Sequence, residues 1–595
     1  MHRSARSRAI LWTIINLWIV GPAVVIAILL SCCTPTYAGP SAASTKFRML
    51  LASEERRAKS ISDGWQVDLL KNIERQDRSV LNDINRINRN ELSSEEKTLY
   101  DVLRRQLGSQ VEQFRLGLYM TPYWDDSRFG RSLLATLSNF SNGLNVTSTD
   151  ATTVIQQVES LAIFADRHIE LLTLGLGAKM MPSKPVIQPT IAAIEYLLRT
   201  PPERWTVYTS VDPKGTAEDR ARIRAALLAS IHQALVPALT RLHDFLTNQY
   251  LPACPDFLSL KRWPNGGDVY REFVRRETTI SIEPEKVHEL GVHEVERIHD
   301  KMAIIAAKEG FPEPAGRFIA RTFSDPQFYF KTPSELAGAY RDALMRIEPR
   351  LGQLFYRLPS RKIDIEEARY RGPAAIYNSK NGAVVVEVSR PDLRPRFEII
   401  PLMLHEGSPG HHLQLSLERE LSSTRDRWPP FLRRQSAAFS EGWALYAETL
   451  GEDLGLYDEP YARFGELSMD LLRAVRVVVD TGVHYYGWTE EKARQYFAEA
   501  TGRPQEVVDT EMTRFSYPGS SLAYKVGQLQ FLAIRNDLKK ALGNAFDIRN
   551  MHEAILTWGP LPLDVLDRKV RDCLKRRECV LRAPLGRETR PRDLR

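Results

Sequence analysis

The spacing of apolar residues along the chain predicts helices over most of its length. From residue 46 to residue 118, apolar positions alternate with charged ones at intervals of three and four, as at Leu69 and Ile73, which places the apolar side chains on one helical face. The same periodicity recurs at 152–174, 191–198 and 217–250. Two further helices are expected to begin at Pro284 and Pro333, because proline at the first helical position leaves no N–H unsatisfied.

One segment instead has the pattern of a strand. Residues 382–389 read Gly-Ala-Val-Val-Val-Glu-Val-Ser, a run of β-branched residues bounded by glycine and proline, which favours an extended conformation. The predicted fold class is therefore mainly α. A division near Pro255 would separate a helical N-terminal lobe, 46–254, from a helical C-terminal lobe, 255–595, that holds the chemistry. We expect the two lobes to form one continuous domain.

Composition and charge narrow the class of protein. The chain has 595 residues, with 81 lysines and arginines against 74 aspartates and glutamates, a net charge of +7. Hydrophobic residues make up 43% of the chain and charged residues 26%, which is ordinary globular usage and excludes a fibrous or disordered chain. A surplus this small does not indicate nucleic-acid binding, and no nucleic-acid-binding motif is present. No protein partner is inferred.

The N-terminus carries a targeting signal over residues 1–38. Three arginines among the first eight residues precede an uncharged stretch with an apolar centre at 10–30, which is typical of a bacterial secretory leader. Three fates are open: lipidation of Cys32 in a lipobox-like sequence, cleavage after Ala38, or retention as an anchor of about 20 residues. Each fate places the body outside the cytoplasm, as a periplasmic or membrane-attached protein.

The five cysteines exclude a disulfide-dense scaffold. Cys32 and Cys33 belong to the leader, whereas Cys573 and Cys579 are close enough in sequence for a local disulfide. Pairing of these two requires an oxidising compartment, and two free thiols are the alternative.

The chemistry is expected where three of the twelve histidines fall within eight residues. His405 is followed directly by Glu406, as in helical zinc peptidases, where two histidines one turn apart hold Zn²⁺ and the glutamate takes a proton from water. The fourth residue after His405 is Pro409, which cannot bind a metal. Omitting Ser408 and Pro409 leaves His-Glu-Gly-Gly-His, so His411 is the expected second ligand.

A local bulge is needed to bring these histidines together. Pro409 lacks an N–H and clashes with the preceding helical turn, whereas Gly410 tolerates unusual dihedrals. His412 is the alternative second ligand, because on an ideal helix it lies within about 20° of His405, although about 10 Å farther along the axis. A straight helix would not give either His411 or His412 to the same metal as His405. If His411 binds, His412 is expected to support a ligand or touch substrate.

A third protein ligand is expected from a later helix. Glu441 lies among small and aromatic residues that look buried, and a buried carboxylate requires a partner. Glu448 follows two turns later on the same face and would orient a ligand histidine.

Two further segments are expected to complete the site. Arg476, Asp480 and His484 recur every four residues and would form a hydrogen-bonded row on one helical face, with an ordinary intrahelical salt bridge as the alternative. Tyr517 and Tyr524 lie at the start of a late helix. We expect Tyr524 to stabilise the tetrahedral oxyanion that forms when water attacks a carbonyl, with His484 as a second stabilising group.

A second His-Glu sequence is predicted to be structural. His288 and Glu289 are followed by His293, and five residues put the two histidines about 140° apart on a helix. The surrounding apolar pattern is regular and gives no signal for a bulge.

Together these motifs resemble a known family. The segments His405 to Gln414, Ser440 to Tyr446, Val479 to His484 and Pro518 to Tyr524 are similar to those of the bacterial domain-of-unknown-function 885 family. The similarity runs through most of the mature chain and is strongest between residues 368 and 543. Many members are secreted proteins or lipoproteins, which agrees with the leader.

The order of the motifs also resembles that of helical zinc peptidases of the thermostable carboxypeptidase and oligopeptidase type. This resemblance implies a large multi-helical bilobed body with a deep cleft and a small β-sheet near the metal, where the strand at 383–388 would be the edge that pairs with peptide. It implies His405, His411 and Glu441 as Zn²⁺ ligands and Glu406 as the base. The two-residue insertion before His411 departs from the peptidase pattern and keeps the second ligand open.

The sequence thus predicts an exported zinc metallopeptidase that hydrolyses short peptides with metal-activated water. Glu406 would remove the proton from that water and pass it to the leaving amine. The alternatives are a zinc amidase acting on a non-peptide or cell-wall amide, and a non-catalytic extracytoplasmic binding protein.

Overall fold

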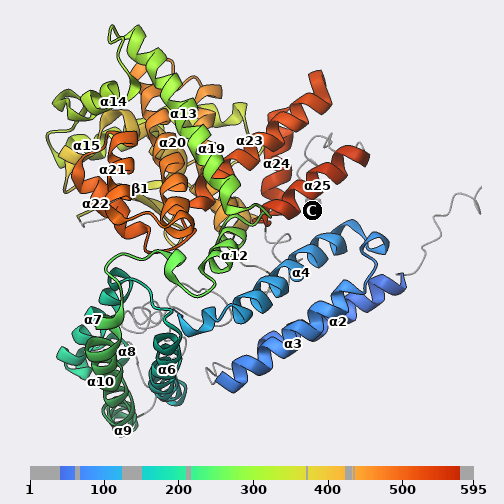
Figure 1. Cartoon of the computed structure of the whole chain (residues 1–595), viewed down its shortest axis with the longest axis vertical. Coiled ribbons are helices and arrows are strands. Elements are labelled where there is room, and N and C mark those ends of the chain that lie inside the picture. The colour runs from blue at the N-terminus through green and yellow to red at the C-terminus, as the bar shows by residue number, and fades with distance from the viewer. Residues whose placement is uncertain are drawn as a thin grey trace, which may run out of the picture.

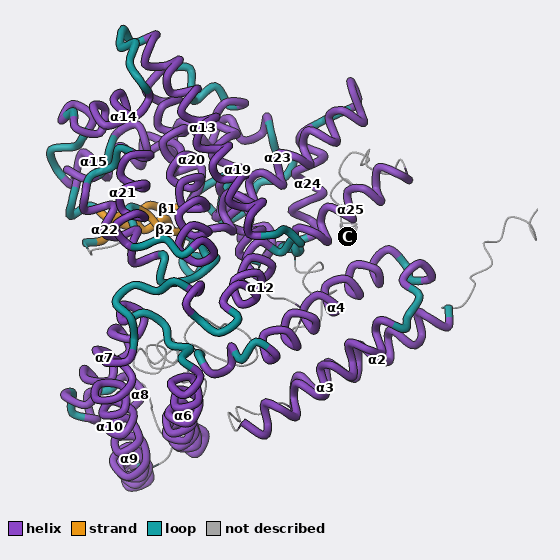
Figure 2. The backbone as a smooth tube through the Cα atoms, in the orientation of Figure 1, coloured by secondary structure: helices purple, strands orange, loops and turns teal. Residues whose placement is uncertain are grey.

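The computed structural model of the chain describes residues 41–60, 67–122, 151–209, 216–369, 373–421, 432 and 436–576. Helices dominate these residues, and the strands form one small sheet (Figures 1 and 2), so the predicted mainly α fold class is confirmed. The leader at 1–38 and Cys579 lie outside the described residues. Cys573, the other half of the predicted pair, is disulfide-bonded.

The first part of the chain forms two groups of helices, drawn in blue and in green in Figure 1. The first group is α2 (Ala42–Ser60), α3 (Val67–Asn85) and α4 (Ser94–Arg115). The second group is α6 (Ala151–Ala178), α7 (Lys184–Arg199), α8 (Thr206–Thr209), α9 (Ala217–Ser230), α10 (Val236–Phe245) and α11 (Leu251–Ala253). The helices predicted at 46–118, 152–174, 191–198 and 217–250 are therefore confirmed.

The apolar residues of the first group are divided between two cores. Leu70 and Ile73 of α3 pack with α6 to α11 in a cluster that extends to Cys254, next to the predicted division at Pro255. Phe47 and Leu103 instead belong to the largest cluster, together with residues of the C-terminal helices. The segment 46–254 thus packs in part against the rest of the chain, and its treatment as a separate lobe stays a prediction.

Among the described residues, one helical run, Ala217–Ala253, is long and apolar enough to cross a membrane. Its residues Leu227, Ile231, Leu235 and Leu239 are fully buried in the cluster that α6 and α7 share. These four side chains therefore pack against neighbouring helices, and 28% of the most apolar window of the run is buried.

The remaining helices build the larger body in the upper part of Figure 1. They are α12 (Gly266–Thr278), α13 (Pro284–Lys308), α14 (Ala315–Ser324), α15 (Pro333–Ile347), α16 (Ile399–Glu406), α17 (His411–Glu420), α19 (Ala437–Asp453), α20 (Pro460–Thr481), α21 (Glu490–Thr501), α22 (Gln505–Arg514), α23 (Leu522–Leu542), α24 (Ile548–Trp558) and α25 (Leu563–Arg576). The helix starts predicted at Pro284 and Pro333 are confirmed. Thr332 caps α15, because its hydroxyl oxygen accepts a hydrogen bond from the Glu335 N–H at 3.2 Å.

Helices α19 and α23 cross at unusually short range. A Cβ added at Gly442 would lie 2.5 Å from the Gly527 Cα, and one at Gly527 would lie 2.2 Å from the Ala438 carbonyl oxygen. Only glycine permits this backbone approach. The crossing fixes Glu441, which precedes Gly442, relative to Tyr524, which lies one turn before Gly527.

The sheet contains β1 (Asp364–Ala368), β2 (Ala375–Asn378) and β3 (Ala383–Glu387), in the order β1-β3-β2 (Figure 2). Strand β3 pairs parallel with β1 and antiparallel with β2. The strand predicted at 382–389 is confirmed, but its predicted place at an edge is wrong. A run such as Val384 to Val386 suits a central strand, since Val384 and Val386 are completely buried. The edge next to the site is β2.

Candidate metal centre

The two histidine-bearing helices meet at a sharp interruption. Helix α16 ends at Glu406 and α17 begins at His411, with a cis peptide bond between Ser408 and Pro409 in the connection. A Cβ at Gly410 would lie 1.9 Å from the His405 carbonyl oxygen, so the connection closes only with glycine there. The Trp443 indole N–H donates to the Pro409 carbonyl at 2.9 Å, which ties the interruption to α19.

This interruption brings His405 and His411 together. Their ring centroids lie 5.0 Å apart and the rings are perpendicular. The Nε2 atoms of both rings lie 3.5 Å from the same carboxylate oxygen, Oε2 of Glu441. Ligand atoms that share a tetrahedral Zn²⁺ at about 2.1 Å lie about 3.4 Å apart. The distances from Glu441 to the two histidines are thus those of donors to one ion.

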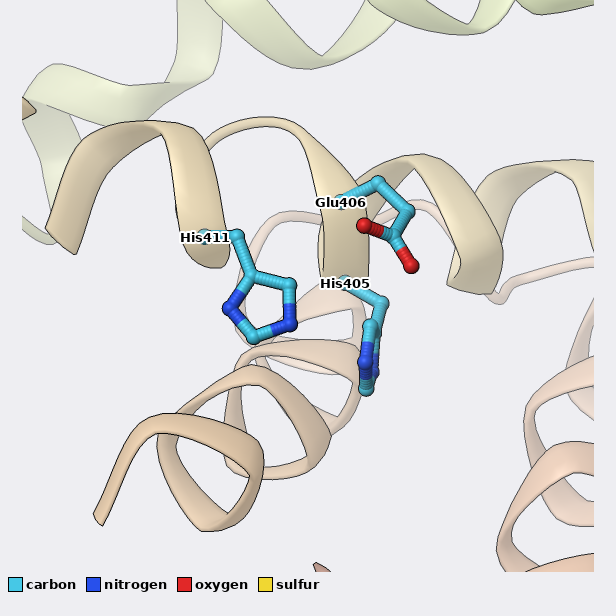
Figure 3. A group of neighbouring side chains, drawn as sticks. All are labelled: His405, Glu406 and His411. Carbon is cyan, nitrogen blue, oxygen red and sulfur yellow. The ribbon is translucent and has the colours of Figure 1, made fainter. Parts of the chain in front are cut away.

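Glu406 belongs to the same cluster. Ligand atoms of His405, Glu406 and His411 all lie within 4.8 Å of one another, and Figure 3 shows the carboxylate close to the two imidazole rings. The Glu406 Oε2 accepts a hydrogen bond from the Tyr377 backbone N–H at 2.8 Å. The edge strand β2 therefore positions the carboxylate that the sequence predicts as the base.

Glu448 fixes the tautomer and orientation of His405. The His405 Nδ1–H donates to Glu448 Oε1 at 2.7 Å, so Nε2 presents its lone pair toward Glu441. Glu448 is 1% exposed, and its charge is offset by Arg473, whose Nη2 lies 3.5 Å from the same oxygen. This is the carboxylate–histidine arrangement that supports metal ligands in zinc sites.

The charges of the cluster favour a cation. Burial alone would lower the pKa of His405, but the carboxylates of Glu441 and Glu448 raise that pKa to about 9. Burial likewise opposes ionisation of Glu441, yet contacts with His405 and His411 hold its pKa well below the usual range. The same carboxylates that stabilise a proton on His405 would also attract a divalent cation.

Tyr524 lies against the histidine pair with its hydroxyl free. Its ring is nearly parallel to that of His405, with centroids 6.4 Å apart, and the Arg476 guanidinium lies 5.9 Å from the centre of the Tyr524 ring. Burial and the charge of Glu441 raise the pKa of Tyr524. Its hydroxyl makes no hydrogen bond within the described part of the chain, so a protonated donor is available beside His405.

His412 points elsewhere. Its Nε2–H donates to the Arg361 carbonyl at 3.1 Å, and its ring packs edge-on against Tyr377, with centroids 5.3 Å apart. Burial lowers the pKa of His412. The structure brings His411, not His412, to His405, and His412 supports the strand whose N–H holds Glu406.

The predicted row on α20 is not brought into the cluster as a unit. The Asp480 carboxylate accepts from the Tyr270 hydroxyl at 2.6 Å and from the Gly519 N–H at 3.0 Å. His484 donates from Nε2 to the Phe515 carbonyl at 2.8 Å, and its Nδ1 lies 3.5 Å from the Leu260 nitrogen. Both ring nitrogens of the fully buried His484 face backbone groups, so its predicted catalytic role finds no support.

Arg476 reaches the site indirectly. Its guanidinium makes two 2.6 Å hydrogen bonds to Glu511 on α22, and it contacts the centre through the Tyr524 ring. The four-residue spacing predicts a shared helical face, which stays a prediction. It could not reveal that α20 is buried from Phe464 to Thr481, so that each member meets a different neighbour.

Sequence reasoning missed two groups that position the site. Tyr377 contributes a backbone N–H, to which side-chain identity gives no signal. Arg473, which faces Glu448, is with Arg476 one of two positive charges in the apolar middle of α20, and a charge among apolar residues is the signal that could have identified it. The second His-Glu sequence is structural as predicted, since His288 bonds the Thr481 hydroxyl and His293 is exposed.

Comparison with known proteins places the chain in a family. The family described as "Bacterial protein of unknown function (DUF885)" matches residues 55–570. The chain belongs to the DUF885 family. This assignment agrees with the resemblance carried by the four motifs, and the family's description states no activity. No curated protein matches the sequence.

Two solved structures share the DUF885 protein's fold. One is described as a "putative lipoprotein" from Colwellia psychrerythraea and has 23% sequence identity and a TM-score of 0.73. The other, described as a "putative lipoprotein of unknown function" from Shewanella oneidensis, has 14% identity and a TM-score of 0.64. Each match covers 90% of this chain and 100% of the other chain.

Proposed function

We propose that this DUF885 protein is a zinc metallopeptidase that hydrolyses short peptides outside the cytoplasm. The observation that supports this most strongly is the geometry around Glu441, whose single carboxylate oxygen lies 3.5 Å from the Nε2 atoms of both His405 and His411. Two histidines and one carboxylate are the ligand set of many catalytic zinc sites, which keep a fourth position for water or substrate.

The surrounding residues fit hydrolysis of an amide. Bound Zn²⁺ would polarise the scissile carbonyl and lower the pKa of water. Glu406, held by the Tyr377 N–H, takes a proton from the attacking water and delivers it to the leaving amine. The Tyr524 hydroxyl donates to the oxyanion that develops on the carbonyl. Glu448 keeps His405 in the tautomer that leaves Nε2 free.

The proposed location rests on two independent features. Residues 1–38 have the pattern of a secretory leader, and the two proteins of like fold are described as lipoproteins. Attachment to a membrane through Cys32 or through a retained apolar anchor is compatible with both features.

The test is profiling of a peptide library by mass spectrometry, with and without a zinc chelator. We expect hydrolysis that the chelator removes and added Zn²⁺ restores. Glu406→Gln should lower the rate by about 100-fold or more while zinc stays bound, because the substitution removes the base but no ligand. Glu420→Gln, at the exposed end of α17, is the matched control and should leave the rate unchanged.

Three outcomes would contradict the proposal. Hydrolysis that persists in Glu406→Gln at the wild-type rate would exclude the assigned base. Hydrolysis of non-peptide amides in place of peptides would favour the amidase hypothesis, and stoichiometric zinc without any hydrolysis would favour the binding-protein hypothesis.

A further inference from the structure

A cavity of about 570 Å³ opens where α22 ends and the chain turns into α23. Its lining residues are Thr510, Thr513, Arg514, Tyr517 and Ser520. The volume lies within the range of about 300–1,000 Å³ that is typical of small-ligand sites. A chain of contacts links the cavity to the proposed centre. Arg514 lies 3.5 Å from Glu511, which bonds Arg476, and Arg476 lies over the ring of Tyr524, which stacks on His405.

Arg514 gives this wall a positive charge that the protein only partly neutralises. Its Nε lies 3.5 Å from the Glu511 carboxylate, but that carboxylate already accepts both short hydrogen bonds from Arg476. Within the described residues, the terminal nitrogens of Arg514 have no hydrogen bond or ion pair. Two arginines share one glutamate, which leaves one surplus positive charge beside the cavity.

The surplus charge is held in place. Arg476 on α20 and Glu511 on α22 are both buried, and the Arg476 charge together with burial lowers the pKa of Arg514. The turn that contributes Tyr517 and Ser520 to the lining is anchored by the Gly519 N–H, which donates to Asp480. An anion in the cavity would relieve the repulsion between the arginines without any rearrangement of these elements.

We propose that this cavity binds the C-terminal carboxylate of the peptide substrate and that Arg514 determines this specificity. The inference rests on the proposed function, and it makes the protein a carboxypeptidase-type enzyme that cuts at a short, fixed distance from the C-terminus. A guanidinium with free terminal nitrogens matches a carboxylate in a two-bond geometry. One surplus positive charge matches a carboxylate monoanion. The 38% exposed Tyr517 ring offers an apolar contact for the last side chain.

Peptide binding tests whether the cavity beside Arg514 recognises a C-terminal carboxylate, independently of catalysis. The zinc-loaded full chain carrying Glu406→Gln is titrated calorimetrically with N-acetyl-trialanine as the free acid and as the C-terminal amide. We expect the acid to bind about 10- to 100-fold more tightly, the value of a charge-assisted hydrogen-bond pair. Adding Arg514→Gln should remove this difference.

Arg494→Gln is the matched control, because the Arg494 side chain is 34% exposed against 35% for Arg514. Arg494 pairs with Glu490 and with Asp509 of α22 but does not line the cavity. The control should keep the preference for the acid. Equal affinity for acid and amide, or a preference that survives Arg514→Gln, would overturn the inference.

Hydrolysis by the wild-type chain separates this inference from the proposed function. Metal-dependent hydrolysis that treats free-acid and amidated peptides alike would overturn the carboxylate pocket and leave the peptidase intact. A preference for the acid in binding, without hydrolysis of either form, would overturn the peptidase and support the pocket.

Discussion

Two buried clusters of titratable side chains differ in what their atoms are left free to do. Around His405, the Nε2 atoms of two histidines face one oxygen of Glu441 at 3.5 Å, a distance too long for a good hydrogen bond. Around Asp480 and His484, the Asp480 carboxylate accepts from the Tyr270 hydroxyl at 2.6 Å and from the Gly519 N–H at 3.0 Å, and the Nε2 of His484 donates to the Phe515 carbonyl at 2.8 Å.

The difference separates a site from a structural network. Ligand atoms that face one another without forming short hydrogen bonds can bind an ion. Polar atoms that are each paired with a hydrogen-bond partner stabilise a packed core instead. Burial lowers the pKa of His484 to about 4 but does not prevent neighbouring carboxylates from raising that of His405 to about 9. Both clusters are buried and rich in histidine and acid, and only the arrangement of their partners distinguishes them.

The largest expected difference is between two variants, each of which replaces one histidine, His405 or His484, by glutamine. His405→Gln should abolish zinc binding and peptide hydrolysis, because it removes a ligand. His484→Gln should retain zinc and turnover while lowering the free energy of unfolding by about 1–3 kcal/mol, since it leaves the Phe515 carbonyl unpaired. Zinc analysis, hydrolysis rates and urea unfolding measure the three quantities. Equal loss of activity in both variants would break the comparison.

Substituting one tyrosine in each cluster tests the same comparison through the reaction rate. Tyr524→Phe should lower kcat by about 100- to 1,000-fold with little change in KM, because its hydroxyl acts on the oxyanion and not on bound substrate. Tyr270→Phe, which removes the hydroxyl that bonds Asp480, should leave kcat unchanged. Steady-state kinetics on one cleaved peptide decides between them, and a Tyr524→Phe enzyme with normal kcat would remove Tyr524 from the mechanism.

A smaller effect on zinc affinity is expected from Glu448, which hydrogen-bonds the proposed ligand His405. Glu448→Gln should weaken zinc affinity by about 10- to 100-fold, because the neutral amide no longer strengthens His405 as a ligand. Competition with a chelator of known affinity measures the shift. Glu466→Gln changes another buried glutamate, which lies 3.6 Å from Arg463 and, within the described part of the chain, contacts no proposed ligand, and should leave zinc affinity unchanged.

The smallest effect concerns pH and the structural cluster alone. Burial raises the pKa of Asp480 to about 7, although the Tyr270 hydroxyl and Gly519 N–H oppose the shift. A carboxyl with a raised folded-state pKa stabilises the fold most below its unfolded pKa, and this stability is lost as pH rises through the folded value. From pH 6 to pH 8 the contribution should fall by about 1.4 kcal/mol. Asp480→Asn should remove this component from the pH profile of urea unfolding, and an unchanged profile would contradict the assignment.

The sequence predicts well those parts of the fold that local chemistry determines. Pro409 and Gly410 indicate a break between His405 and His411, and the close packing of Gly410 on the His405 carbonyl explains why that break has its shape. Pro333 and its Thr332 cap mark a helix start that the structure reproduces. Each of these signals depends on residues within a few positions of one another.

What the sequence could not predict depends on partners far along the chain. The β-branched run at 383–387 indicates a strand but not that β1 and β2 flank it. The spacing of Asp480 and His484 indicates one helical face but not that Gly519 and Phe515 cover it. His411 and His412 differ by one residue, and only the turn between α16 and α17 decides which ring faces Glu441.

The central claim is that His405, His411 and Glu441 hold a zinc ion. It is tested most directly by measuring zinc per chain in the purified full-length protein and in two adjacent variants, His411→Ala and His412→Ala. The account predicts one zinc per chain in the wild type and in His412→Ala, and almost none in His411→Ala. Loss of zinc from His412→Ala alone, or a wild-type protein that binds no zinc, would contradict it.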